Sequence, residues 1–171
     1  MKRILPCLAA LAFGLFTPQA FAQPMIDPIG DLIQDALRES AETITELAPD
    51  WVLKATLYHS GAPGVGGRDS LGCPTVAMRT AATDRTLVPR RTILFIKETV
   101  GMPMPDGRPH DGYWYASDVG GAIKGARIDL FTGSSRGSMA PMMRLNLKAV
   151  TVSRVGTFEG CPKADVRIAA R

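Results

Sequence analysis

Six short segments rich in β-branched and aromatic residues follow one another between residues 51 and 156, and they constrain the fold more than any other feature of the chain. They are WVLKATLY, TVAMRTAAT, RTILFIKETV, GYWYASD, ARIDLFTG and LKAVTVSRVG. The loops between them are rich in glycine, proline, aspartate and serine, which typically end strands. Closing short strands into a barrel leaves no exposed sheet edge. We therefore expect an all-β domain over residues 51–157, built as a small six-stranded barrel.

One segment of the chain after the first 22 residues has helical periodicity. In DPIGDLIQDALRESAETITELAPDW the apolar residues recur largely at helical spacing. Asp27 is the expected N-cap, Pro28 takes the first helical position and Pro49 ends the helix. We predict one amphipathic helix in an N-terminal extension of residues 23–50. Its apolar stripe is expected to pack outside the barrel, and contact with a partner or a membrane surface is the alternative.

The first 22 residues are typical of a cleavable export signal. MKR is cationic, ILPCLAALAFGLF is apolar but too short to span a bilayer comfortably, and Ala20 and Ala22 stand at the two small-residue positions that precede a cut. We predict cleavage between Ala22 and Gln23, which makes the mature protein periplasmic or secreted. No later apolar run is long enough to cross a membrane, so we do not expect the mature chain to span one.

Two of the three cysteines, Cys73 and Cys161, remain after this cleavage, each within a GCP triplet. In an oxidising compartment such a pair most simply forms one disulfide, which would tie a C-terminal tail of residues 158–171 to an early loop. Two unpaired, buried thiols are the alternative. Neither cysteine has a CxxC partner, and His59 and His110 show no ligand spacing. We therefore expect no metal and no cofactor.

Composition and charge narrow the range of partners. With 171 residues, 46% hydrophobic and 21% charged, the chain resembles an ordinary globular domain with short extensions. The formal net charge of +4 falls to +2 when Lys2 and Arg3 leave with the signal. Because the chain has neither a basic run nor an interleaved aromatic platform, we expect no nucleic acid partner.

Three stretches of the barrel resemble a known family. They are ATLY in the first expected strand, TDRTLVPRRT in the middle and, above all, SDVGGAIKGARIDLF. They are similar to the three-aspartate (3D) domain, a double-psi β-barrel. That domain occurs as the C-terminal barrel of membrane-bound lytic murein transglycosylase A and in small stand-alone cell-wall proteins. The resemblance covers about residues 52–156, and the pattern D-x-G-G-A-I-K-G followed by an aspartate-bearing strand is its most specific part.

The resemblance implies three site aspartates. Asp129, in RIDLF, matches the catalytic general acid of the transglycosylase, and Asp118, in SDVGG, matches its close carboxylate neighbour. Asp84, in TDRTLVP, matches the first aspartate of the stand-alone proteins, which the large transglycosylase lacks. We expect Asp129 to be the acid, with Asp118 and Asp84 assisting. For Asp84, a purely structural role in capping a turn is the alternative.

The implied activity is cleavage of the β-1,4 bond after N-acetylmuramic acid (MurNAc) in peptidoglycan. An acid protonates the glycosidic oxygen, and the C6 hydroxyl of the same sugar attacks to give a 1,6-anhydro product, so one well-placed acid can suffice. That acid must hold its proton near neutral pH. Apolar neighbours and a second carboxylate both raise the pKa of an aspartate, and Ile128, Leu130 and Asp118 would supply them around Asp129.

Glycan ligands also require an open approach to the backbone. We expect the glycines of this loop to let a bulky sugar come close to the backbone; they are Gly120, Gly121 and Gly125. Lys124 is expected to bind substrate or to keep Asp118 ionised, and a solvated loop charge is the alternative. The expected ligands are peptidoglycan glycan strands or muropeptides. A barrel that binds such glycans without catalysis is the second class of function consistent with these residues.

Overall fold

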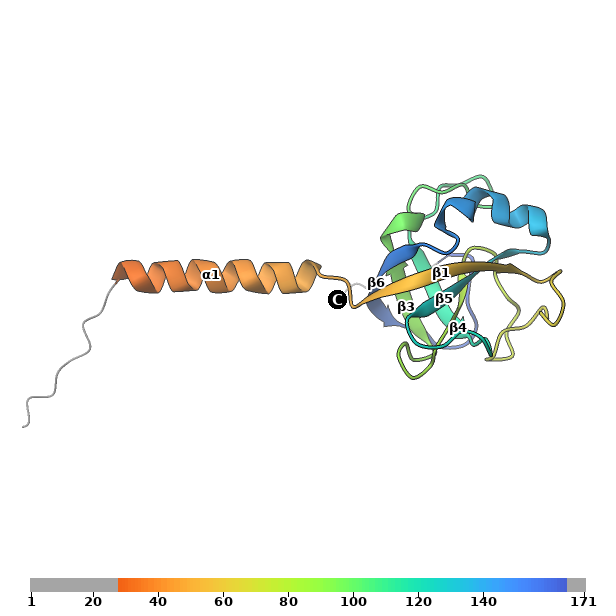
Figure 1. The fold of residues 1–171 in the computed structure, drawn as a ribbon, viewed down its shortest axis with the longest axis horizontal. Helices are drawn as coiled ribbons and strands as arrows, with labels where there is room; N and C mark the ends of the chain where they lie inside the picture. The colour runs from red at the N-terminus through yellow and green to blue at the C-terminus, as the bar shows by residue number, and fades with distance from the viewer. Residues whose placement is uncertain (1–27, 166–171) are drawn as a thin grey trace, which may run out of the picture. The chain divides into compact units, whose positions relative to one another are not determined.

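The computed structural model of this protein describes residues 28–165 (Figure 1). The chain divides into two compact units between Thr43 and Ile44. Helix α1 (Pro28–Leu47) confirms the helix expected from the apolar periodicity. Asp31 lies in its first turn, where a negative charge interacts favourably with the positive end of the helix dipole. The packing of α1 on the barrel and the domain limits stay predictions. The export signal of residues 1–22 lies outside the described residues.

Six strands form the second unit and confirm the six segments expected from the sequence. They are β1 (Trp51–His59), β2 (Thr80–Thr83), β3 (Thr92–Ile96), β4 (Tyr113–Asp118), β5 (Arg127–Gly133) and β6 (Ala149–Thr157). They close into a barrel in the order β1-β5-β2-β4-β3-β6. The β1–β5 and β2–β4 pairs are parallel and the other four are antiparallel. This is the expected double-psi β-barrel (Figure 1).

The barrel interior is filled by every second side chain of the strands. Leu53, Ala55 and Leu57 of β1 are buried, as are Ile128 and Leu130 of β5. The residues between them point to the opposite face, because side chains alternate along a strand. Ile128 and Leu130 therefore point into the core, and Asp129 between them points to the outer side of the barrel wall.

One helical segment was not expected from the sequence. Segment η2 (Arg136–Leu145) is a 3-10 helix with Pro141 inside it. Gly137, Ser138 and Pro141 disfavour a regular α-helix here, although the other residues of the segment are good helix formers. The segment is fixed by packing instead, because Met142 and Leu145 are buried in the core cluster. A second short turn, η1 (Lys97–Thr99), ends β3 earlier than the expected segment.

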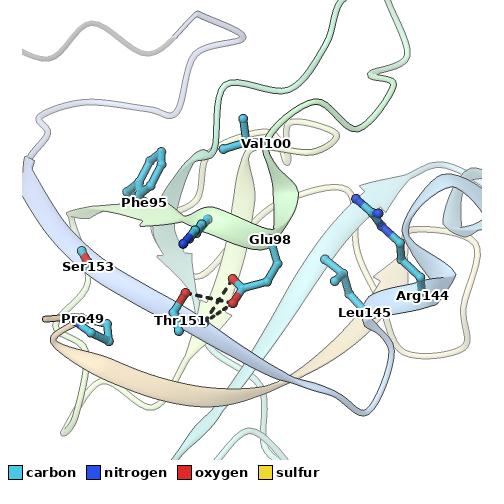
Figure 2. Close-up of a pocket in the computed structure, with 9 residues that line it drawn as sticks. Pro49, Phe95, Glu98, Val100, Arg144, Leu145, Thr151 and Ser153 are labelled. Atoms are coloured by element: carbon cyan, nitrogen blue, oxygen red, sulfur yellow. Dashed lines mark hydrogen bonds between the residues drawn. The ribbon is translucent and has the colours of Figure 1, made fainter. Parts of the chain in front are cut away.

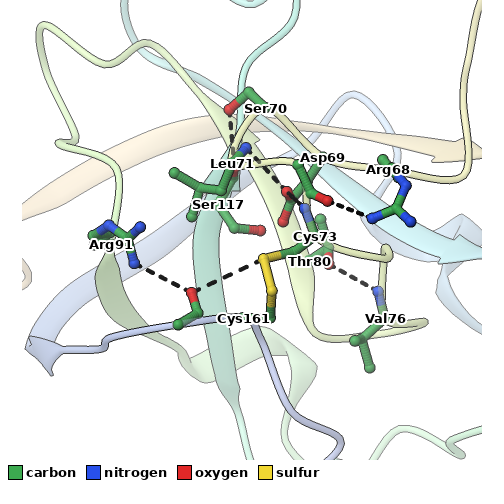
Figure 3. The surroundings of a disulfide bond; sticks show 12 residues. Arg68, Asp69, Ser70, Leu71, Cys73, Val76, Thr80, Arg91, Ser117 and Cys161 are labelled. Carbon is green, nitrogen blue, oxygen red and sulfur yellow. Dashed lines mark hydrogen bonds between the residues drawn. A yellow bond between two sulfur atoms is a disulfide. The ribbon is translucent and has the colours of Figure 1, made fainter.

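A disulfide joins Cys73 to Cys161 across 88 residues, with a Cα–Cα distance of 5.4 Å (Figure 3). It confirms the expected pairing and ties the chain after β6 to the loop before β2. The same loop turns back on itself through Asp69, whose Oδ1 accepts the backbone N–H of Cys73 at 2.9 Å. Within residues 28–165, no helix is both long and apolar enough to pass through a bilayer.

Candidate active site

A row of four register partners crosses the barrel wall and contains both expected carboxylates. Thr56 of β1 pairs with Asp129 of β5, Asp129 pairs with Ala82 of β2, and Ala82 pairs with Asp118 of β4. Residues paired across strands project to the same face of a sheet. The row therefore brings Asp118 and Asp129 to one side of the wall, and the small side chain of Ala82 leaves space between them.

These residues line a cavity of about 410 Å³. Its walls come from β1, β2, β4, β5, the loop before β2 and the loop after β4. The lining consists of Tyr58, Gly64, Val65, Gly66, Arg68, Asp69, Ser70, Ala82, Asp118, Val119, Gly120, Gly121 and Asp129. Of the sequence-predicted residues, Asp118, Asp129, Gly120 and Gly121 meet here. Asp84 and Lys124 are not part of this lining.

Asp129 is half-buried, and its carboxyl has one hydrogen-bond partner, Thr56. The hydroxyl Oγ1 of Thr56 lies 2.7 Å from Asp129 Oδ1 and 3.4 Å from the carbonyl oxygen of Ile128. Burial raises the pKa of Asp129 above its ordinary value, the nearby charge of Asp118 raises it further, and the hydrogen bond from Thr56 opposes both. A carboxyl with a raised pKa keeps its proton to higher pH, as a general acid requires.

Asp118 is held by three donors. Its Oδ1 accepts the backbone N–H groups of Ser70 at 2.9 Å and Val119 at 2.8 Å, and its Oδ2 accepts the hydroxyl of Tyr58 at 3.0 Å. An ionised carboxylate is an acceptor and satisfies all three. The donors come from the loop before β2, the loop after β4 and strand β1. They fix the direction in which the carboxylate faces the cavity.

The sequence analysis gave no role to Thr56, which donates to Asp129, or to Tyr58, which donates to Asp118. Burial, followed by the charge of Asp118, raises the pKa of Tyr58 well above its ordinary value, so the phenol stays protonated and donates. Its ring packs on Phe131 at a centroid distance of 5.2 Å. Both residues belong to ATLY and alternate with buried Leu57, so strand periodicity was the signal that could have placed them on the face of Asp129.

A third carboxylate in the cavity, Asp69, was also missed. Its side chain is buried, and Oδ1 accepts the backbone N–H groups of Leu71 at 3.0 Å and Cys73 at 2.9 Å. Its Oδ2 is buried and has no hydrogen-bond partner among the described residues. The segment GGRDSLGCP reads as a turn, and only the closure of the barrel brings this turn beside β4.

Asp84 lies at the surface and holds a loop instead of lining the carboxylate cavity. Its Oδ2 accepts the backbone N–H of Gly125 at 2.8 Å, and its Oδ1 accepts the backbone N–H and the hydroxyl of Thr86 at 3.0 and 2.8 Å. The N–H of Gly125, followed by the two donors of Thr86, lowers the pKa of Asp84 to about 2. These contacts match the turn-capping alternative and connect the loop after β2 with the loop before β5.

The three aspartates predicted from the motif lie within residues 79–141, which match the 3D domain family. Solved structures similar to this chain include the membrane-bound lytic murein transglycosylase of Agrobacterium tumefaciens, at 30% identity over 49% of this chain and 24% of that one, with a TM-score of 0.37. The lytic transglycosylase LtgG of Burkholderia pseudomallei is 28% identical over 54% and 28%, with a TM-score of 0.37.

A third solved structure is the lytic transglycosylase MltA of Escherichia coli, at 26% identity over 54% of this chain and 28% of that one, with a TM-score of 0.38. The chain thus spans about a quarter of the length of each of these three proteins. No curated protein matches the chain. The residues matched by the 3D domain family include β2, β3, β4, β5 and the cavity loop after β4, whereas β1 and the cavity loop before β2 lie outside them.

A larger concavity of about 720 Å³ lies elsewhere on the barrel, beside β3 and β6 (Figure 2). Its one carboxylate is Glu98. Both oxygens of Glu98 accept the backbone N–H of Thr151, at 3.0 and 3.1 Å, and Oε1 also accepts the Thr151 hydroxyl at 2.8 Å. Since these bonds occupy its acidic group, we place the candidate active site in the smaller cavity, where Asp118 and Asp129 meet.

The described residues offer no site for a metal ion. Within residues 28–165, no three histidine, cysteine, aspartate or glutamate side chains are grouped so that they could hold a metal ion. His110 is buried, stacks on Trp114 at 4.9 Å and receives the backbone N–H of Gly112. Its contacts are those of a core residue.

Proposed function

We propose that this protein is an exported, peptidoglycan-active enzyme, a small lytic murein transglycosylase. It cleaves the β-1,4 bond between MurNAc and N-acetylglucosamine (GlcNAc) and leaves a 1,6-anhydro-MurNAc end. The observation that carries this proposal is the environment of Asp129, a half-buried carboxyl with a raised pKa that shares a cavity with Asp118. The 3D domain match supports the substrate class. Export rests on the signal-like first 22 residues.

In the proposed reaction Asp129 is the only proton donor required. It gives its proton to the glycosidic oxygen, and the bond from this oxygen to C1 of MurNAc breaks. The C6 hydroxyl of the same sugar attacks C1, and its proton passes to the carboxylate left on Asp129, which restores the acid. Because the nucleophile belongs to the substrate, correct positioning supplies much of the rate. Ionised Asp118 stabilises the positive charge that develops at C1.

Other residues of the site act by positioning. Thr56 orients the carboxyl of Asp129, and Tyr58 with the N–H groups of Ser70 and Val119 orients Asp118. Gly120 and Gly121 give the ligand a wall of backbone without side chains. Asp84 acts at a distance, through the loop that it ties down.

Product analysis with purified sacculi tests this function. The mature protein, beginning at Gln23, is incubated with sacculi, and the soluble fraction is examined by mass spectrometry for 1,6-anhydromuropeptides. We expect anhydro products from the wild-type protein alone, without added metal or cofactor. The pelleted sacculi are assayed for bound protein in parallel. Protein that sediments with sacculi and releases no anhydro product would be a glycan-binding barrel and would refute the enzymatic proposal.

A further inference from the structure

Two cationic side chains, Arg85 and Lys124, line a second concavity of about 280 Å³. Both are exposed, and within the described part of the chain neither forms a hydrogen bond or a salt bridge. Lys124 interacts electrostatically with Asp84, but both oxygens of Asp84 are already bound by donors of Gly125 and Thr86. The two cations are therefore available to an anion from solution.

This basic concavity shares a wall with the carboxylate cavity. Val119, Gly120 and Gly121 line both of them. The two glycines place no side chain on the wall, and a Cβ added to Gly121 would meet no atom within 4 Å. A ligand seated against Asp129 can thus extend over Gly121 and reach the cations on the other side.

The two concavities differ in charge. Asp69 and Asp118 line the first together with one cation, Arg68, and with Asp129, which the proposed mechanism keeps protonated. The acidic groups outnumber the cation there and disfavour an anionic part of a ligand. Arg85 and Lys124 line the second, where the same anionic part is attracted. A ligand that fits both has an uncharged sugar ring in the first and a carboxylate held a short distance away in the second.

We propose that Arg85 and Lys124 bind a carboxylate attached to the saccharide in the neighbouring cavity, and that they thereby select glycans that contain muramic acid. Muramic acid carries its carboxylate on a lactyl ether, either free or joined to a peptide that has carboxylates of its own. N-acetylglucosamine has none. This inference deepens the proposed function, because it takes the glycan ligand from it.

Asp84 gains a role in this arrangement. Its two oxygens bind Thr86 and Gly125, which directly follow Arg85 and Lys124 in the chain. One carboxylate therefore joins the two segments that present the cations. Asp84 is a positioning residue for the basic concavity, which accounts for its place outside the carboxylate cavity.

Binding measurements with three oligosaccharides of equal ring number test the proposal. The first is a neutral GlcNAc oligomer, the second is a peptide-free GlcNAc–MurNAc oligomer, and the third is the same oligomer with its peptides. Affinities are measured by calorimetry in an Asp129→Asn background, so that no ligand is cleaved. We expect the anionic oligomers to bind about three- to tenfold tighter than the neutral one, as two exposed ion pairs allow, and this gain to shrink with added salt.

Three variants locate the effect. Arg85→Ala with Lys124→Ala should remove the gain, so that the anionic oligomers bind no tighter than the neutral one. Lys97→Ala with Arg144→Ala is the matched control, because both are exposed cations that line the separate concavity in Figure 2. The control should keep the full gain. Gly121→Leu should weaken binding of the anionic oligomers, because its side chain enters the space over the shared wall.

The outcomes separate this inference from the proposed function. A gain with both anionic oligomers assigns the lactyl carboxylate, and a gain with the third alone assigns the peptide; both support the proposal. Equal affinity for all three, binding of none, or a gain that survives in the Arg85 and Lys124 double variant overturns it. Failure to form anhydro products from sacculi would refute catalysis but would leave a measured preference for anionic glycans standing.

Discussion

Asp118 and Asp129 are both register partners of one residue, Ala82, which lies on the strand between theirs. Neighbouring strands are about 4.8 Å apart, so the two backbones are separated by roughly 10 Å, with the methyl group of Ala82 between the two aspartates. This spacing is close enough for the charge of Asp118 to raise the pKa of Asp129. Both aspartates line the same cavity of about 410 Å³.

Removing that charge is expected to make Asp129 a stronger acid. Asp118→Asn should lower the pKa of Asp129, although burial will keep it above the ordinary value. Because a general acid works in its protonated form, the alkaline limb of the pH–activity profile should move to lower pH. Asp106→Asn, a change at an exposed aspartate paired with Arg108, is the control and should leave the profile unchanged. An alkaline limb that stays in place or moves upward in Asp118→Asn would contradict this coupling.

Thr56 has the opposite effect to Asp118 on the pKa of Asp129, because its hydrogen bond lowers that pKa. The Thr56 hydroxyl favours the ionised form of Asp129, so Thr56→Val should raise the pKa of Asp129 further and shift the alkaline limb to higher pH. Valine has nearly the shape of threonine, and Thr56→Ser keeps the hydroxyl as a control. The carboxyl carbon of Asp129, followed by NMR titration, gives the pKa directly. A lower pKa in Thr56→Val than in Thr56→Ser would show that the hydrogen bond has been misread.

Asp84 is expected to contribute stability that depends on pH. Its pKa is lowered from 3.8 to about 2 by the donors of Gly125 and Thr86, so its contribution is present above pH 4 and is lost as the pH falls toward 2. Asp84→Asn should therefore be less stable than the wild type at neutral pH, and the difference should vanish near pH 2. Urea unfolding over this pH range measures it. A difference that is constant with pH would point to lost packing instead of lost charge.

The disulfide is expected to stabilise both the fold and the cavity. Cys73→Ser with Cys161→Ser should lower the free energy of unfolding by about 3–5 kcal/mol, because the bridge closes a loop of 88 residues in the unfolded chain. Asp69 and Ser70 lie in the loop that it anchors, so activity should fall by more than in a variant of equal stability. Intact mass with and without reductant verifies the bridge, and denaturant unfolding gives the free energy. Two free thiols in protein purified after export would refute the pairing.

Much of this barrel was readable from the sequence because its strands are short, regular and separated by strong turn signals. Asp129 also stands out in the sequence, because a carboxyl between two aliphatic residues of a strand is costly to bury and needs a functional or structural explanation. The resemblance to the 3D domain then implied Asp118 and Asp84. What these observations lacked was the strand order, which depends on contacts between residues far apart in the chain.

The residues that sequence reasoning missed are those brought to the site by that order. Tyr58 and Thr56 reach the aspartates only because β1 pairs with β5 in parallel. Asp69 reaches them because the loop before β2 folds back on β4, where Ser70 donates to the Ser117 carbonyl at 2.9 Å. Asp84 was placed with the other aspartates by its motif, whereas its side chain points to the loop before β5. Local pattern identifies such residues poorly, since their partners are set by the closed barrel.

The identity of the proton donor is the central claim, and product formation by Asp129→Asn tests it most directly. The amide keeps the shape of the side chain but has no carboxyl proton to give, so anhydro-product formation from sacculi should fall by about 10²–10⁴-fold. Asp106→Asn is assayed beside it, and circular dichroism confirms that each protein is folded. We predict full activity in Asp106→Asn and a loss of this size in Asp129→Asn. Equal rates of anhydro-product formation by the wild type and a folded Asp129→Asn would contradict the assignment of the acid to Asp129.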